Sequence, residues 1–234
     1  DFVGRGYITQ EELDEYDFGN DDGYVDYPAM YKSRWEVLRR CYENSPYVSE
    51  AQGHWADPRY FNERDEFAVF IKDNAQWLND YALYSALKSK RDMRSFLEWE
   101  EPVRKREPSV LEKEAFDGAE DIRFYQFVQF FFMKQWMNLK RYANENGVYI
   151  IGDIPIYVAM DSADTWSNPG LFMFDEQGNP SCVAGVPPDA FSEDGQLWGN
   201  PLYEWDRHEK DGYDWWIRRI GKWRELYDVI RLDH

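Results

Sequence analysis

The chain has 234 residues, 43% of them hydrophobic in the broad count, and it carries 27 basic against 45 acidic side chains, a formal net charge of −18. This length can bury a sizeable core and suits one domain, with or without a subdomain. The acidic balance argues against binding to nucleic-acid phosphates or to an anionic membrane surface, since both need clustered Lys and Arg. The sequence shows no apolar run near the roughly 18 residues of a spanning helix and no signal-peptide pattern.

Cysteine, histidine and aromatic usage narrows the class of protein further. Cys41 and Cys182 lie far apart, which argues against a disulfide framework or a CxxC metal site and favours a reducing, cytoplasmic setting. The three histidines are scattered without metal-ligand spacing, so we expect no metal. Aromatic residues make up 18% of the chain. They indicate mainly a large aromatic core and, as the alternative, surfaces that stack on sugar rings.

The first half of the chain is predicted to be mostly helical. Residues 1–28 form an acidic, glycine-interrupted loop. Apolar residues at helical spacing then predict three helices, at about 29–45, 59–73 and 75–98, the last ending before Pro102.

The second half follows the order helix, strand, helix, strand. An apolar face of helical period predicts a helix over 122–146, and the apolar run 148–151 after it indicates a buried parallel strand. A second helix is predicted at about 211–225 and a second strand at 228–233. This alternation predicts an α/β fold.

Both predicted strands end on carboxylates. Asp153 follows the first strand and Asp233 closes the second, and the carboxyl ends of parallel barrel strands carry the active site. Arg231 lies two residues before Asp233, so both side chains point to the same side of a strand. A guanidinium keeps a neighbouring carboxylate ionised, as a nucleophile requires. A structural salt bridge is the alternative interpretation of this pair.

A long stretch between the strands, 155–206, is rich in Pro, Gly, Asp and Trp and is predicted to be an irregular loop. Such a loop inside an α/β unit is usually functional. Its Trp residues, among them Trp166, offer apolar faces for sugar rings, and its Asp, Asn and Gln residues suit sugar hydroxyls. A rigid surface loop whose Trp residues cover the fold explains the composition equally well.

Five segments of this half carry a family resemblance. In chain order they are 152–158 (Gly-Asp-Ile-Pro-Ile-Tyr-Val), 161–166 (Asp-Ser-Ala-Asp-Thr-Trp), 183–192 (Val-Ala-Gly-Val-Pro-Pro-Asp-Ala-Phe-Ser), 195–203 (Gly-Gln-Leu-Trp-Gly-Asn-Pro-Leu-Tyr) and 229–234 (Val-Ile-Arg-Leu-Asp-His). Together they closely resemble the 4-α-glucanotransferases of the amylomaltase, or disproportionating, type, which form glycoside hydrolase family 77. The resemblance is densest over 122–234 and extends to 75–87.

The resemblance implies a role for each matching residue. Asp233 matches the catalytic nucleophile, Arg231 the residue that holds it, and Asp153 a residue that contacts donor sugar hydroxyls. A loop that lines and partly covers the acceptor side is matched by Asp189, Phe191, Gln196 and Trp198, and Asn200 belongs to the same motif. Ala190 stands where many relatives carry Tyr, so one aromatic sugar contact is expected to be missing. The family implies no cofactor.

The implied reaction is a retaining double displacement on α-1,4-glucans, that is, maltooligosaccharides or starch chains. A glucan hydroxyl, rather than water, resolves the covalent glucosyl-enzyme. Retention needs a second carboxyl group about 5–5.5 Å from the nucleophile. The family supplies that Glu, and a further stabilising Asp, from later strands, outside residues 1–234, so this chain alone is expected to be inactive.

The implied fold is part of a (β/α)8 TIM barrel with a mostly helical inserted subdomain. Residues 1–115 are expected to form the subdomain and 116–234 a partial barrel, from helix 2 to the end of strand 4. Because a whole barrel takes about 250 residues, we expect the chain to be an internal piece of a longer enzyme. The alternatives are a glucan-binding, non-catalytic chain and an α-amylase-type hydrolase. The sequence indicates no oligomeric state.

Overall fold

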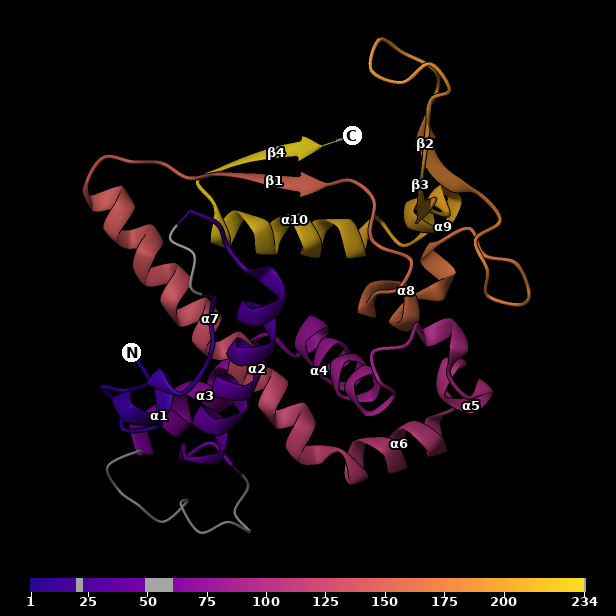
Figure 1. Ribbon diagram of the computed structural model, residues 1–234. Coiled ribbons are helices and arrows are strands. Elements are labelled where there is room, and N and C mark those ends of the chain that lie inside the picture. Colours follow the sequence, from indigo (N-terminus) through magenta and orange to yellow (C-terminus); the bar gives the residue numbers. More distant parts are fainter. Residues whose placement is uncertain (20–22, 49–60, 234) are drawn as a thin grey trace. The chain divides into compact units, whose positions relative to one another are not determined.

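The computed structural model describes residues 1–19, 23–48 and 61–233 (Figure 1). The chain forms two compact units, and each is treated below by itself. The first contains residues 1–82 and 118–131, and the second contains 83–117 and 132–234. The division at residue 115 expected from the sequence stays a prediction.

The first unit is helical. It contains α1 (Gln10–Asp14), α2 (Tyr27–Glu43), α3 (Phe61–Asp73) and the beginnings of α4 (Ala75–Lys90) and α7 (Ala119–Glu145). Asp26 begins α2 by accepting a hydrogen bond from the Ala29 amide, and a proline in the first turn favours helix at that point. The helices predicted at 29–45 and 59–73 are thereby confirmed, except that residues 59 and 60 lie outside the described residues.

An aromatic core holds this unit together. Tyr47 is fully buried, and its ring centroid lies 5.0 Å from that of Phe67 and 5.6 Å from that of Phe127. Edge-on and tilted pairs of this kind add to the stability that apolar burial provides. The first half of α7 therefore buries the predicted apolar face. Beyond Phe131, the predicted face is exposed at Phe132, Leu139 and Tyr142.

The second unit begins with short helical pieces in place of one long helix. After α4 come a 3-10 turn, η4 (Phe96–Glu98), then α5 (Glu101–Arg104) and α6 (Pro108–Asp117). The helix predicted over 75–98 is wrong beyond Lys90. Asp92 and Met93 have φ values of 55° and 61°, in the left-handed region, which ends a right-handed helix.

Two parallel strands, β1 (Ile151–Pro155) and β4 (Val229–Asp233), form the sheet that carries the predicted carboxylates (Figure 1). The second strand was predicted correctly, but the first was placed too early. Gly147, at φ +76°, ends α7 with the Val148 amide bonded to the Ala143 carbonyl at 2.9 Å, so the run from Val148 still belongs to the helix terminus. Asp153 consequently lies within β1 rather than after it.

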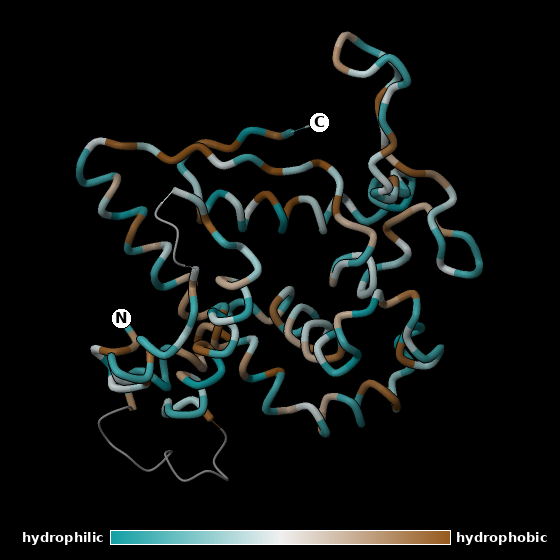
Figure 2. Tube along the Cα trace, viewed as in Figure 1, coloured by the Kyte–Doolittle hydropathy of each residue, from teal (hydrophilic) through white to brown (hydrophobic). Residues whose placement is uncertain are grey.

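Helix α10 (Asp214–Leu226) packs along one face of this strand pair (Figure 1). Gly152 allows the close approach, because a Cβ atom there would lie 2.2 Å from the ring of Tyr227, which directly follows the helix. Ile154, on the same face, is fully buried. Figure 2 shows hydrophobic colour along both strands and hydrophilic colour at the carboxyl end of β4. Within the described residues the pair is not part of a closed barrel.

The stretch 155–206 is more regular than predicted. It contains α8 (Ala163–Ser167), a 3-10 turn η5 (Pro169–Leu171), the antiparallel hairpin of β2 (Val183–Val186) and β3 (Gln196–Pro201), and α9 (Trp205–Lys210). Gly195 lets the hairpin close, because its φ is +72° and a Cβ would lie 2.5 Å from the Val186 carbonyl oxygen. Of the two cysteines, Cys41 is buried and Cys182, just before β2, is exposed.

Candidate functional site

The alternation of side chains along β1 and β4 places three predicted site residues on one face. Asp153 pairs with Arg231 across the ladder, and Pro155 pairs with Asp233. Because side chains two residues apart share a face, Arg231 and Asp233 project together, opposite the face that packs on α10. One face of two parallel strands thus presents two carboxylates around one guanidinium, with Asp153 within β1 and Asp233 at the carboxyl end of β4.

Arg231 binds both carboxylates, but not equally. Its Nε and Nη2 donate to the two oxygens of Asp153 at 2.8 Å each, whereas Nη2 donates to Asp233 Oδ1 at 3.1 Å. Hydrogen bonds to Asp153, and the negative charges of Asp153 and Asp233, raise the pKa of Arg231 above its ordinary value. The bidentate partner of Arg231 is therefore Asp153, and Asp233 keeps one carboxylate oxygen free of this guanidinium.

The site is open to solvent. Side chains of Asp153, Arg231 and Asp233 are 50%, 64% and 45% exposed. The backbone around Asp233 is nevertheless held, since its carbonyl accepts a hydrogen bond of 2.9 Å from the Ile156 amide, one residue beyond β1. This arrangement can present a fixed carboxylate to a ligand that approaches from above the strand ends.

Two polar or aromatic residues that were predicted to suit sugars have structural roles. Trp166 is 1% exposed and packs in a core with Tyr84 and Trp99. For Trp166, therefore, the alternative interpretation is correct: it packs on the fold and offers no face to a sugar. Asp161 accepts hydrogen bonds from Tyr84 at 2.6 Å, from the Phe96 amide at 3.1 Å and from Lys88. Both residues fasten the segment after β1 to α4 and η4, within the second unit.

The remaining predicted residues lie on the β2–β3 hairpin. Asp189 shapes its tip by accepting hydrogen bonds from the amides of Phe191 and Ser192, at 2.8 and 2.9 Å. That turn leaves the Phe191 side chain 93% exposed. On β3, Gln196 accepts a hydrogen bond of 3.0 Å from the indole of Trp198, which is exposed. The tip and β3 thus offer two aromatic faces next to polar groups, a combination that suits a sugar.

Asn200 is the hairpin residue that reaches back toward β1. Its Nδ2 donates to the Val158 carbonyl at 2.8 Å. Among the described residues, no hydrogen bond or ion pair joins the hairpin residues Asp189, Gln196 and Trp198 to the Asp153–Arg231–Asp233 cluster. The structure therefore presents the predicted site residues as two groups within one unit, which are linked through the backbone that follows β1.

Sequence reasoning missed Tyr203 as part of this link. Tyr203 is 2% exposed, and its hydroxyl donates to the Ile156 carbonyl at 2.6 Å. The available signal was its place at the end of the motif 195–203.

Among the described residues, no group of three or more His, Cys, Asp or Glu side chains is arranged to hold a metal ion. His208 is buried and its Nε2 lies 3.2 Å from the Leu171 carbonyl oxygen, while His54 and His234 lie outside the described residues. The expected absence of a metal or cofactor stays a prediction. In the same part of the chain, no helix is long and apolar enough to cross a membrane.

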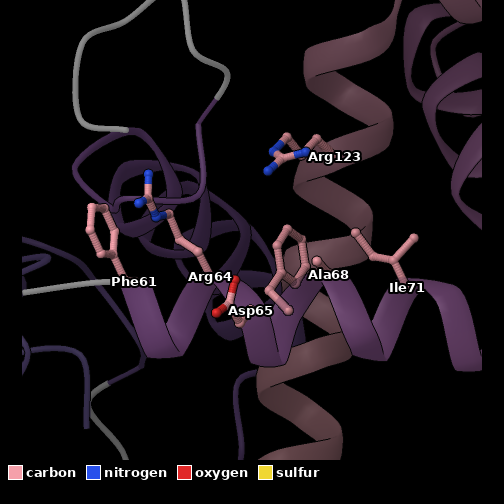
Figure 3. Close-up of a pocket in the computed structure, with 7 residues that line it drawn as sticks. Phe61, Arg64, Asp65, Ala68, Ile71 and Arg123 are labelled. Atoms are coloured by element: carbon pink, nitrogen blue, oxygen red, sulfur yellow. The ribbon is translucent and has the colours of Figure 1, made fainter. Parts of the chain in front are cut away.

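A pocket of about 520 Å³ opens in the first unit, between α3 and α7 (Figure 3). Two guanidinium groups line it: the Cζ of Arg64 lies 4.7 Å from the centre of the Phe61 ring, and that of Arg123 lies 5.3 Å from the centre of the Phe67 ring. None of the predicted site residues lines this pocket, so the strand-end cluster remains the candidate site.

Comparison with known proteins identifies the family. Residues 1–234 match the glycoside hydrolase 77 family, described as 4-alpha-glucanotransferase. The chain is 40% identical to a 4-alpha-glucanotransferase of Clostridium butyricum over 233 residues, 98% of this chain and 45% of that protein. It is 42% identical to that of Thermus thermophilus over 230 residues, 98% of this chain and 43% of that protein.

A solved structure agrees with the sequence matches. Amylomaltase from Streptococcus agalactiae, in complex with acarbose, superposes with a TM-score of 0.88 at 36% identity, covering all of this chain and 45% of that one. The present chain thus spans less than half the length of these relatives, and its helices and strands match part of the amylomaltase structure. The chain belongs to the glycoside hydrolase 77 family of 4-alpha-glucanotransferases.

Proposed function

We propose that the protein transfers α-1,4-glucan segments between maltooligosaccharides or starch chains by a retaining double displacement, with Asp233 as the nucleophile. The observation that carries the proposal is the Asp153–Arg231–Asp233 cluster on one face of two parallel strands, with Asp233 at the carboxyl end of β4. We also propose that these strands form part of a (β/α)8 barrel, because the carboxyl ends of the strands carry the active site in that fold.

In the first half-reaction, a carboxylate oxygen of Asp233 attacks the anomeric carbon of the donor glucan. The bond from that carbon to the glycosidic oxygen breaks, and the leaving oxygen takes a proton from a general acid. In the second, the 4-hydroxyl of an acceptor glucan attacks the same carbon and gives its proton to the same residue, now a base, while Asp233 leaves. Two inversions retain the configuration.

Arg231 supports this chemistry by position and charge. Its single hydrogen bond to Asp233 Oδ1 orients the carboxylate and leaves the other oxygen for attack. Asp153 accepts hydrogen bonds on both oxygens from Arg231, so neither oxygen is placed to deliver a proton as the acid. We assign Asp153 the role of binding hydroxyls of the donor sugar. We assign the role of general acid to a Glu outside these residues, so the 234-residue chain alone is inactive.

The hairpin supplies the acceptor side in this proposal. Phe191 and Trp198 stack on glucose rings, while Asp189, Gln196 and Asn200 lie beside them as polar groups for hydroxyls. The acarbose complex of the related amylomaltase supports a carbohydrate ligand. The cytoplasmic location expected from the cysteine usage stays a prediction.

A product assay tests the proposal. The full-length protein, incubated with maltotriose, is expected to yield glucose together with longer oligomers. Formation of glucose and maltose alone, without longer products, would instead favour the α-amylase-type hydrolase.

A second candidate function is glucan binding without catalysis by the 234-residue chain itself. The exposure of Phe191, at 93%, favours it, because an exposed ring beside polar groups is a surface for a sugar. Calorimetry of this chain with maltoheptaose is expected to show binding and no turnover. Turnover by the chain alone would contradict this assignment.

A further inference from the structure

Tyr203 lies where three parts of the second unit meet. It lies two residues after the end of β3, its ring packs at 5.0 Å from that of Trp216 on α10, and it stacks on Tyr157 of the segment after β1 at 6.1 Å with an interplanar angle of 15°. Rings on several sides leave it 2% exposed. A side chain packed in this way has one orientation, so its hydroxyl has a fixed target.

That target is the backbone of Ile156. The Tyr203 hydroxyl donates to the Ile156 carbonyl at 2.6 Å, and the Ile156 amide donates to the Asp233 carbonyl at 2.9 Å. Two short hydrogen bonds through one residue therefore connect the end of the hairpin to the backbone of the proposed nucleophile. Hydrogen bonds in series polarise and reinforce one another.

A second hydrogen bond holds the same segment, two residues further along the chain. Asn200, on β3, donates from Nδ2 to the Val158 carbonyl at 2.8 Å. Between the two hydrogen bonds, the ring of Tyr157 lies 6.4 Å from the ring of Trp198. The segment 156–158 is thus held at one end by Asn200 of β3 and at the other by Tyr203 just beyond β3, and it contacts Trp198 between them.

The Tyr203 hydroxyl keeps its proton over the working range of pH. Burial raises its pKa far above the usual value for tyrosine. It is therefore a permanent donor, and its loss would leave the Ile156 carbonyl without this partner in a half-buried place.

We propose that Tyr203 is a positioning residue that holds the β2–β3 hairpin at a fixed place relative to Asp233, through Ile156. The inference rests on the proposed function, in which the hairpin binds the acceptor. Its consequence is a choice between acceptors: a well-placed hairpin presents a glucan hydroxyl to the glucosyl-enzyme, and a displaced hairpin admits water instead.

The test is Tyr203→Phe in the full-length protein, with Tyr84→Phe as the matched control. Tyr84 is also buried, at 6% exposure, and its hydroxyl also makes a 2.6 Å hydrogen bond, but to Asp161, away from the hairpin. Both variants lose one hydroxyl from a buried aromatic cluster, so a general loss of stability should lower both melting temperatures alike.

Only Tyr203→Phe is expected to raise the acceptor KM, by roughly five- to tenfold, the factor that one lost hydrogen bond typically costs. It should also raise the fraction of donor that is hydrolysed, with a smaller change in kcat. Hydrogen exchange should show the Ile156 amide exchanging faster in Tyr203→Phe and unchanged in Tyr84→Phe.

Equal effects of the two variants on KM and on hydrolysis would overturn the inference, as would faster Ile156 exchange with unchanged KM. A wild-type protein that fails to disproportionate maltotriose would refute the proposed function instead. In that event the exchange experiment still decides whether Tyr203 fixes the Asp233 backbone.

Discussion

Arg231 aligns two of its nitrogens with the two oxygens of Asp153, on the neighbouring strand, at 2.8 Å each, and gives Asp233 of its own strand only one hydrogen bond. The parallel register explains the preference, because it sets Asp153 directly across from Arg231. The fork of a guanidinium matches a carboxylate in this geometry. Asp233 is therefore oriented without being fully occupied, as a nucleophile should be.

Replacing the proposed nucleophile should abolish transfer. Asp233→Asn in the full-length protein is expected to lower kcat by about 10⁴-fold or more, because an amide cannot form the covalent intermediate. The melting temperature should change little, since the side chain is 45% exposed. Asp206→Asn, at an exposed position on α9, is the control and should retain wild-type activity. Normal disproportionation by Asp233→Asn would remove Asp233 from the mechanism.

Arg231→Lys separates charge from geometry. An ammonium keeps the positive charge but cannot contact both oxygens of Asp153 and one of Asp233 in a fork. We expect kcat/KM to fall on the order of 10²-fold, the loss that accompanies a small misplacement of a reacting group. Arg218→Lys, which alters an exposed ion pair with Asp214 on α10, is the control and should leave kcat/KM unchanged. An equally active Arg231→Lys enzyme would show that charge alone suffices.

Gly152→Ala should destabilise the protein by about 1–3 kcal/mol, as overpacking does. The added Cβ would lie 2.2 Å from the Tyr227 ring, so either β1 or the ring must shift. Gly221→Ala, within α10 and with open space around it, should instead stabilise by about 0.5–1 kcal/mol. Denaturant unfolding of both variants measures the difference. Similar unfolding midpoints for the two would mean that the contact with Tyr227 relaxes freely.

The Asp161 carboxylate should make stability depend on pH in the acid range. Burial raises its pKa, but hydrogen bonds from Lys88, Tyr84 and the Phe96 amide outweigh burial, so the folded pKa lies below 3.8. A group with a lowered folded pKa stabilises above its unfolded pKa, and this contribution is lost as pH falls through the folded value. The difference in melting temperature between wild type and Asp161→Asn should therefore shrink below about pH 4. A difference that stays constant from pH 7 to pH 3 would contradict this linkage.

Phe191→Ala should weaken acceptor binding without cost to stability. Its ring is 93% exposed, so removing it uncovers no core. Loss of one stacking surface is expected to raise the acceptor KM several-fold, given the roughly 1 kcal/mol typical of aromatic contacts. Phe116→Ala, an 83% exposed ring on α6, is the matched control. If both variants keep the wild-type KM, the hairpin tip does not contact the acceptor.

The sequence predicts which residues share the face that carries the site, but it does not predict which of these residues bind one another. Two-residue alternation along β4 predicts that Arg231 and Asp233 share a side. The bidentate contact with Asp153 depends on strand register, which no local pattern encodes. The helix break after Lys90 escaped prediction because no Gly or Pro marks it, and the positive φ falls on Asp92 and Met93 instead.

The hairpin was missed for a different reason. Its strands are short and contain glycine and proline, so residues 183–201 resemble a loop in composition. What makes them regular is contact across the pair, such as the approach of Gly185 to the Gln196 carbonyl, where a Cβ would lie 2.3 Å away. On α7, in contrast, the helical periodicity of the sequence predicts the burial of Phe124, Phe127 and Phe131 directly.

The unequal exposure of the two cysteines offers an experimental handle. Cys182 is accessible and lies one residue before β2, whereas Cys41 is buried and burial raises the pKa of its thiol to about 11. Within these 234 residues, a thiol-reactive fluorophore should therefore attach at the base of the hairpin alone. Its emission would report arrival of an acceptor directly, without substitution at either group of site residues.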